Sequence, residues 1–154
     1  MKTHRELEEL GAKFLSEIGY FGKCRYVVID PMAVTHEKPD VLGYGWGFTH
    51  VIECKTNIGD FRRDQKKKWR INGDKPMGTY RWWMCESGLI QPEDLPNDGS
   101  GLLWVNSNDE VSVVVQPIEN STDQRNLVAE LDILYTLLNK ETKGGNRIYN
   151  KKNK

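Results

Sequence analysis

A glycine-rich turn between two apolar stretches constrains this chain more than any other feature. Residues 40–56 contain Gly43, Gly45 and Gly47, and twelve residues separate Asp40 from Glu53. Glycine favours tight turns, so we predict two short antiparallel strands joined by a hairpin tip. Successive side chains of a strand point to opposite faces. Glu53 and Lys55 therefore share one face, and Cys54 lies on the other.

Charged side chains on this hairpin predict a chemical site. A carboxylate and an ammonium group at the end of a buried strand are costly to bury unless they are paired or bound to something. Asp40 supplies a second carboxylate from the neighbouring strand. Two converging carboxylates suit Mg²⁺ or Mn²⁺, and Lys55 can hold or activate a water or stabilise charge on a phosphate. The group is typical of metal-assisted phosphodiester hydrolysis.

Pro39-Asp40 followed by Glu53-Cys54-Lys55 resembles the signature of the PD-(D/E)xK nuclease superfamily. Residues 60–69 and 88–103 are similar to its small MmcB-like branch, which is associated with DNA repair. The resemblance spans roughly residues 3–118. It implies a restriction-endonuclease-like α/β core with a mixed central sheet, a Mg²⁺ cofactor that Mn²⁺ can replace, and DNA as the substrate. It also implies that the main-chain carbonyl of Cys54 is a further metal ligand.

The N-terminal segment predicts a helix that ends near Ile18. Thr3 and Glu6 have the spacing of a capping box, and apolar residues follow at helical spacing. Glu8 has two interpretations. It is either a solvated acid at the edge of the apolar stripe or a third metal-binding carboxylate, because the first helix often supplies one in this superfamily. His4 is interpreted as a residue at the rim of the site.

A second helix is predicted from Phe61 to about Ile71, with Asp60 as its N-cap. Its basic run is interrupted only by Asp64. Such a run is either a solvated face or, directly after a metal-site strand, a surface that grips phosphates. The predicted nucleic-acid-binding residues are Arg62, Arg63, Lys66, Lys67 and Arg70.

Two further sets of residues have roles that depend on the resemblance or on packing. Gln65 and Trp69 resemble the Gln-x-x-x-Tyr motif that follows the lysine in RecB-type nucleases. This resemblance implies a catalytic role for Gln65, and we assign Trp69 to packing only. The hairpin aromatics Tyr44, Trp46 and Phe48 either cover the core or stack on bases.

The remaining chain predicts strands at 80–86, 102–106 and 111–115, followed by a helix from Thr122 to Lys140. The order of elements is α-β-β-β-α-β-β-β-α, which fits a mixed sheet flanked by helices. The predicted core stripe of the last helix is Leu127, Leu131, Leu134 and Leu138, with Ile133 and Leu137 beside it.

Composition predicts one domain at 1–142 and a basic, disordered tail at 143–154. The formal net charge is zero, so any attraction to DNA must be local. The sequence contains no apolar run of 18 residues, so no membrane-spanning helix is predicted. The three cysteines lack CxxC spacing and are predicted to be buried free thiols, which indicates a reducing cytoplasm, in a bacterium or as a phage-encoded protein. A homodimer is compatible with the sequence but has no specific signal.

Three functional interpretations follow. The first is a Mg²⁺-dependent nuclease in which Asp40 and Glu53 hold the metal, with Glu8 as the third carboxylate, and Lys55 positions the attacking water. The second is a non-catalytic nucleic-acid-binding or interaction domain on the same fold. The third is an unrelated α/β protein in which Glu53 and Lys55 form an ordinary ion pair.

Overall fold

A six-stranded mixed sheet forms the centre of the molecule. The computed structural model describes residues 1–32 and 36–142, so the predicted tail lies outside the described residues. The strands follow one another across the sheet in chain order. The third, fourth and fifth strands are mutually parallel, and the others are antiparallel to their neighbours. The strands are β1 (Tyr26–Ile29), β2 (Val41–Tyr44), β3 (Thr49–Cys54), β4 (Tyr80–Glu86), β5 (Gly101–Val105) and β6 (Val111–Val115).

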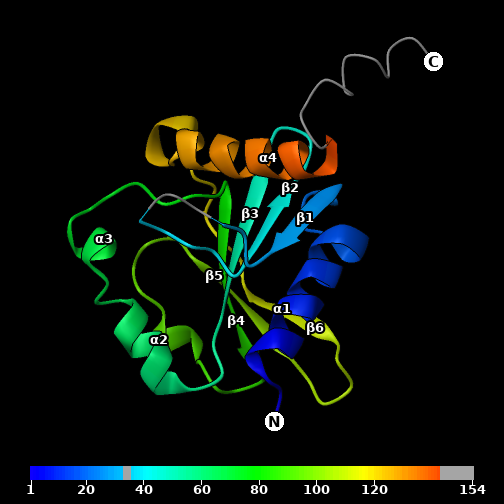
Figure 1. The fold of residues 1–154 in the computed structure, drawn as a ribbon. Coiled ribbons are helices and arrows are strands. Elements are labelled where there is room, and N and C mark those ends of the chain that lie inside the picture. The colour runs from blue at the N-terminus through cyan, green and yellow to red at the C-terminus, as the bar shows by residue number, and fades with distance from the viewer. Residues whose placement is uncertain (33–35, 143–154) are drawn as a thin grey trace.

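Helices flank this sheet, which confirms the predicted α/β class and the order of the elements. Figure 1 shows α1 on one side of the sheet, α2 and α3 on the other, and α4 across one end. The α-helices are α1 (His4–Lys13), α2 (Ile58–Asp64), α3 (Lys68–Ile71) and α4 (Leu127–Thr142). A π-helical turn, Phe14–Ile18, continues α1, and short 3₁₀ turns lie at Pro92–Asp94 and Thr122–Gln124. Within the described ranges, no helix is long and apolar enough to cross a membrane.

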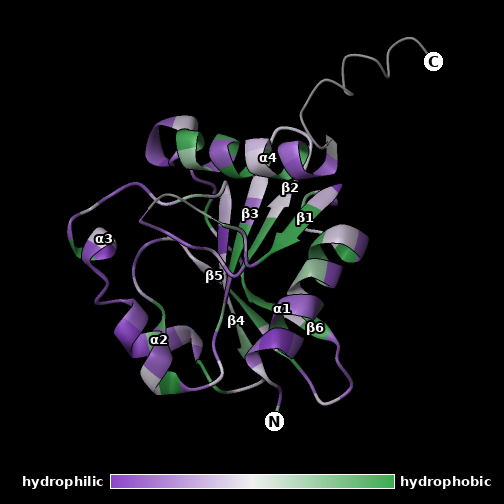
Figure 2. Ribbon diagram, viewed as in Figure 1, coloured by the Kyte–Doolittle hydropathy of each residue, from purple (hydrophilic) through white to green (hydrophobic). Residues whose placement is uncertain are grey.

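Alternating side chains on the central strands build a core on both faces of the sheet. Ile52 and Trp82 pack against Leu7 of α1 and Leu15 of the π-helical turn. The next residue on β4, Trp83, packs with α2 on the opposite face. Figure 2 shows hydrophobic residues along the strands and mostly hydrophilic residues on α2 and α3. This two-sided burial includes every residue of β3, and it explains the continuous apolar run Trp82–Cys85 of β4.

The start of α1 is formed as predicted. The Thr3 side chain accepts a hydrogen bond from the Glu6 amide, and the Glu6 carboxylate accepts one from the Thr3 amide. These bonds satisfy the backbone amides of Thr3 and Glu6 at the helix start, where the first four amides of a helix lack helical partners. This cap fixes the N-terminal turn of α1, which carries His4 and leads to Glu8.

The predicted second helix is wrong in its start and its continuity. Helix α2 begins at Ile58, and its N-cap is Asn57, whose side chain accepts a hydrogen bond from the Asp60 amide. The helix ends at Asp64, and α3 begins only at Lys68 because Lys67 has an extended ψ of 142°. Tertiary ion pairs to Asp64, described below, override the helical propensity of this basic run.

The predicted core stripe of α4 is also wrong, although the two residues predicted beside it, Ile133 and Leu137, do pack on the sheet. The buried apolar residues Ala129 and Ile133 pack with Leu42 and Val51 of the sheet. Leu131, a member of the predicted stripe, is exposed. Several leucine stripes of equal helical spacing exist on this segment, and only docking on the sheet selects one of them. The predicted free thiols are confirmed, because Cys24, Cys54 and Cys85 are buried and unpaired.

Candidate metal centre and its basic flank

The register of the β2–β3 hairpin brings Asp40 and Glu53 to the same level of the sheet. Val41 pairs with Ile52 in this antiparallel pair. Asp40 directly precedes Val41, and Glu53 directly follows Ile52, so the two carboxylates occupy neighbouring positions at one end of the hairpin. The spacing therefore predicts their proximity correctly. Helix α1 passes the same end of the hairpin and adds residues from its first turns.

Two hydrogen bonds orient the Asp40 carboxylate. Its Oδ2 atom accepts a hydrogen bond of 2.7 Å from the Cys54 amide on β3. Its Oδ1 atom lies 3.3 Å from Nε2 of His4 on α1. One oxygen is thus tied to the neighbouring strand while the other faces the helix. The Cys54 main chain thus contacts Asp40 through its amide, while a metal-binding role for its carbonyl stays a prediction.

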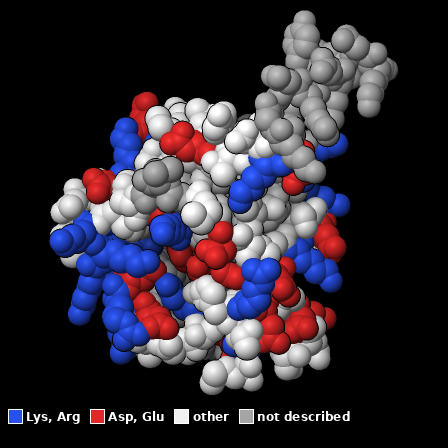
Figure 3. Space-filling view, in the orientation of Figure 1, with Lys and Arg blue, Asp and Glu red and all other residues white. Residues whose placement is uncertain are grey.

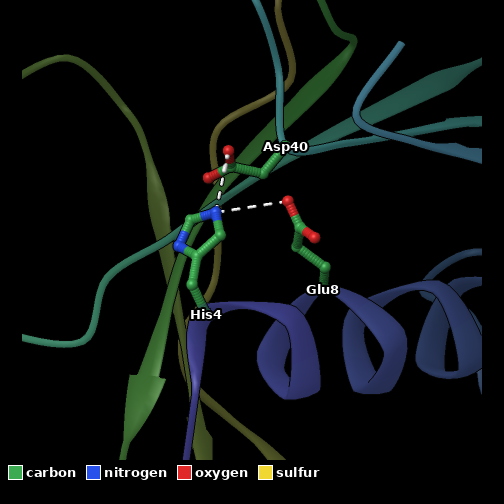
Figure 4. A group of neighbouring side chains, drawn as sticks. All are labelled: His4, Glu8 and Asp40. Carbon is green, nitrogen blue, oxygen red and sulfur yellow. Dashed lines mark hydrogen bonds and ion pairs between the residues drawn. The ribbon is translucent and has the colours of Figure 1, made fainter.

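Glu8 completes a cluster of three ligand-type side chains with His4 and Asp40. Its Oε1 atom is 3.2 Å from His4 Nε2, and the ligand atoms of the three residues lie within 4.8 Å of one another. Figure 4 shows His4 between the two carboxylates. Glu8 is only 6% exposed, so the solvated-acid interpretation is wrong. Burial raises the Glu8 pKa, as does the Asp40 charge, while His4 and Arg5 oppose that rise.

Glu53 is a buried carboxylate without a compensating partner. It is 5% exposed and makes no hydrogen bond or ion pair with any residue of the described ranges. Burial raises its pKa well above the usual value, and the negative charges of Asp40 and Glu37 add to this effect. Arg81 opposes the shift. Glu53 is outside the three-residue cluster of α1 and Asp40, but a cation at this end of the hairpin would relieve its cost of ionisation.

Lys55 does not pair with Glu53 or Asp40 as the sequence suggests. Its Nζ atom lies 2.6 Å from Oδ2 of Asp64, at the end of α2. The same carboxylate contacts Arg70 at 2.9 Å and Lys67 at 3.1 Å. Burial alone would raise the Asp64 pKa, but the hydrogen bond from Lys55 and the surrounding positive charges hold it below its usual value. The Glu53–Lys55 ion pair that the third interpretation assumed is therefore wrong, while its assignment to an unrelated α/β protein stays untested.

The predicted nucleic-acid-binding residues separate into exposed and internal groups. Arg62 and Lys66 are exposed and make no ion pair with a described residue, whereas Arg63 pairs with Asp60. Lys67 is half-exposed and pairs with Asp64. Figure 3 shows Lys and Arg side chains gathered over α2 and α3, next to acidic side chains on the same face.

Arg70 belongs to the interior of this region, which corrects its predicted role at the surface. Its guanidinium group bonds to Asp64 and lies 4.4 Å from the ring centre of Trp69 and 5.0 Å from that of Trp83. A guanidinium group held between a carboxylate and two aromatic rings is packed in the interior and is not available to bind a phosphate. Trp69 is buried, which confirms its assignment to packing.

Gln65 lines a cavity of about 300 Å³ together with Arg70 and Arg81. Its catalytic role stays a prediction. The neighbouring residue Asp64 contacts Lys55. The sequence signal for Asp64 was its position as the one acid inside the basic run at 62–70.

The hairpin aromatics also divide between two roles. Phe48 packs against the core and lies edge-on to His50, with ring centres 5.4 Å apart. Tyr44 donates a hydrogen bond to the Glu130 carbonyl. Trp46 is 98% exposed at the tip, at the opposite end of β2 and β3 from Asp40 and Glu53. The core interpretation therefore holds for Phe48 and Tyr44, and Trp46 contacts neither the core nor the metal-type cluster.

Comparisons with known proteins support the fold alone. No protein-family model matches the chain, and no curated protein matches it. Among solved structures, the chain is similar to a protein of unknown function from Silicibacter pomeroyi, with a TM-score of 0.63 and 21% sequence identity. The match covers 91% of this chain and 89% of that one. The two proteins share an α/β architecture over nearly their whole lengths.

Proposed function

We propose that this protein is a metal-dependent nuclease that hydrolyses phosphodiester bonds of DNA, on a restriction-endonuclease-like core of the PD-(D/E)xK type. The observation that carries this proposal is the meeting of Glu8 and Asp40 from separate elements, with the buried Glu53 at the position next to Asp40 in the hairpin. Two of these carboxylates are buried and have raised pKa values. Proteins rarely concentrate poorly compensated acids unless a cation or a reaction uses them.

The residues present fit a hard divalent cation. Glu8 and Asp40 offer carboxylate oxygens within 4.8 Å of each other, and Glu53 offers a further one beside Asp40. Oxygen donors suit Mg²⁺ and Mn²⁺, and the imidazole of His4 is a donor that Mn²⁺ accepts more readily than Mg²⁺ does. A bound cation supplies positive charge to a phosphate oxygen and lowers the pKa of a bound water.

The chain's own residues would then have distinct tasks. Asp40 is held by the Cys54 amide, so its free oxygen has a fixed direction. His4 Nε2 contacts both Glu8 and Asp40 and keeps these two carboxylates together. Lys55 places a positive charge near the site through its pair with Asp64, where it can stabilise negative charge that develops on the phosphate.

A non-catalytic DNA-binding domain is the second candidate. It is favoured by the ion pair between Lys55 and Asp64, because the lysine contacts neither Asp40 nor Glu53. The basic flank on α2 serves either candidate, and DNA repair is the process that the MmcB-like resemblance implies for the first. Cleavage separates the two candidates, since only the first requires it.

We expect Mg²⁺ or Mn²⁺ to bind the wild-type protein and to support cleavage of a labelled DNA duplex. Asp40→Asn should weaken metal binding at least tenfold and reduce single-turnover cleavage about 10³-fold, because a carboxamide cannot supply the ligand's negative charge. Calorimetry with Mn²⁺ measures binding, and gel analysis measures cleavage. Asp123→Asn, an exposed acid in the 3₁₀ turn before α4, is the matched control. Salt-dependent DNA binding without cleavage by the wild-type protein would favour the second candidate.

We expect the exposed cations of α2 and the following turn to grip the DNA backbone. Each lost phosphate contact flattens the plot of log affinity against log salt by about 0.7–0.9. Arg62→Gln with Lys66→Gln should therefore reduce the slope by about 1.5, uniformly across DNA sequences. Fluorescence anisotropy without divalent metal measures the slope. Lys13→Gln with Lys140→Gln makes the same charge change on α1 and α4, and an equal loss of slope in both variants would place the grip elsewhere.

A further inference from the structure

Asp64 is the most completely paired acid near the candidate site. It is 1% exposed and accepts hydrogen bonds from Lys55 and Arg70, with Lys67 at ion-pair distance. These cations come from three segments: the end of β3, the turn after α2, and α3. One buried carboxylate therefore joins the hairpin that carries Glu53 to the basic segment that follows it.

The contact geometry shows what Asp64 determines for Lys55. Among the described residues, Asp64 is the acid within ion-pair distance of the Lys55 ammonium group, at 2.6 Å. The ammonium group also lies 5.7 Å from the ring centre of Trp83. A lysine side chain has about 2 kcal/mol of rotamer entropy, so without a partner it samples many positions. The pair with Asp64 selects one position for the ammonium group of Lys55, a residue that lies two positions after Glu53 in the chain.

Arg70 holds one oxygen of the Asp64 carboxylate from the protein interior. The Arg70 guanidinium group contacts Asp64 Oδ1 and lies over the rings of Trp69 and Trp83. One carboxylate oxygen is thus held by the interior, while Oδ2 accepts the bond from Lys55. Each oxygen of Asp64 therefore has its own partner, and the bond to Lys55 is a separate contact from the bond to Arg70.

We propose that Asp64 is the positioning residue for Lys55 and holds its ammonium group at a fixed place beside the carboxylates Asp40 and Glu53. This inference rests on the proposed function for its catalytic consequence, but not for the positioning itself. Asp64 acts through Lys55 and is too buried to contact a nucleic acid.

The first measurement tests the positioning without any activity. Lysines of the folded protein are acetylated by brief exposure to acetic anhydride, and mass spectrometry gives the extent at each site. In the wild-type protein we expect Lys55 to react more slowly than Lys66, which is exposed and serves as an internal reference. Asp64→Asn should raise the Lys55 reaction at least fivefold relative to Lys66. An unchanged ratio would overturn the proposal.

Two variants separate positioning from a general loss of structure. Arg70→Gln removes another partner of the same carboxylate but leaves the bond between Asp64 and Lys55 in place, so it should raise the Lys55 reaction less than half as much as Asp64→Asn does. Asp60→Asn changes an acid of the same helix that contacts exposed Arg63 and the Asn57 side chain, and it should leave both the Lys55 and the Lys66 reactions unchanged. If Arg70→Gln raised the Lys55 reaction as much as Asp64→Asn does, loosening of the whole cluster would be the cause, and the proposal would be wrong.

Cleavage then tests the consequence. Asp64→Asn should reduce single-turnover cleavage about 10²-fold at a temperature where the variant is folded, while Mn²⁺ binding stays within threefold of wild type. Loss of metal binding in the same variant would show that Asp64 acts on the carboxylates and not on Lys55. A wild-type protein that never cleaves DNA would refute the proposed function, yet the acetylation ratios would still decide whether Asp64 positions Lys55.

Discussion

Glu53→Gln is expected to abolish cleavage and, at the same time, to stabilise the protein at neutral pH. The folded state raises the Glu53 pKa through burial and through the charges of Asp40 and Glu37. An acid whose pKa is higher in the folded than in the unfolded state destabilises the fold once the pH exceeds its unfolded value. Glutamine has nearly the same shape without the charge. Relief of such functional strain typically contributes about 0.5–2 kcal/mol, or a melting temperature higher by roughly 1–8 °C.

The pH dependence of this gain identifies its cause. We expect the difference in melting temperature to be largest at pH 7–8 and to shrink as the pH falls toward about 4.5, because the destabilisation disappears once the glutamate is protonated in the unfolded as well as the folded state. Thermal melts in EDTA between pH 4.5 and 8 measure it. Glu93→Gln changes an exposed acid in the Pro92–Asp94 turn and should melt like the wild type throughout. A lower melting temperature for Glu53→Gln at pH 7 would mean that Glu53 has a stabilising role.

Local patterns predicted the sheet well because its strands have strong two-sided burial. The turn chemistry of the β5–β6 hairpin is also local, since the Asn106 side chain accepts hydrogen bonds from the Asn108 and Glu110 amides. The break between α2 and α3 could not be predicted in this way. It depends on an extended Lys67 and on partners of Asp64 that lie on other elements. Propensity is a weak guide where buried ion pairs compete with it.

The candidate site was predictable in proportion to how local its contacts are. Asp40 and Glu53 belong to one hairpin, so residue spacing alone places them together. Glu8 required the packing of α1 against the sheet to distinguish a buried ligand from a solvated acid. The partner of Lys55 required the exact start of α2, because a helix beginning at Ile58 places Asp64 within reach of the lysine. No periodicity in the sequence reports that distance.

Arg81→Met is expected to cause the largest loss of stability among the changes considered. Arg81 is buried, pairs with Glu37 at 2.7 Å and donates a hydrogen bond of 2.7 Å to the Met77 carbonyl. Its charge also offsets that of Glu53. Methionine retains most of the side-chain volume but removes the cation that pairs with the buried Glu37 carboxylate. Breaking a buried pair in this way costs about 3–5 kcal/mol, which lowers the melting temperature by roughly 6–20 °C.

Removing both charges should restore much of that loss, which makes the prediction specific to the ion pair. We expect Glu37→Gln with Arg81→Met to melt well above Arg81→Met alone, because neither member of the pair then carries a charge. A denaturant titration of the wild type, both single variants and the double variant measures the coupling. Equal stability of the double variant and Arg81→Met would instead assign the cost to lost packing on Trp69, whose ring centre lies 5.6 Å from the guanidinium group.

Glu37 also accepts a hydrogen bond from the Met77 amide and lies three residues before Asp40. Arg81→Met should therefore weaken Mn²⁺ binding even where the protein remains folded, because the anchor of the segment that presents Asp40 is lost.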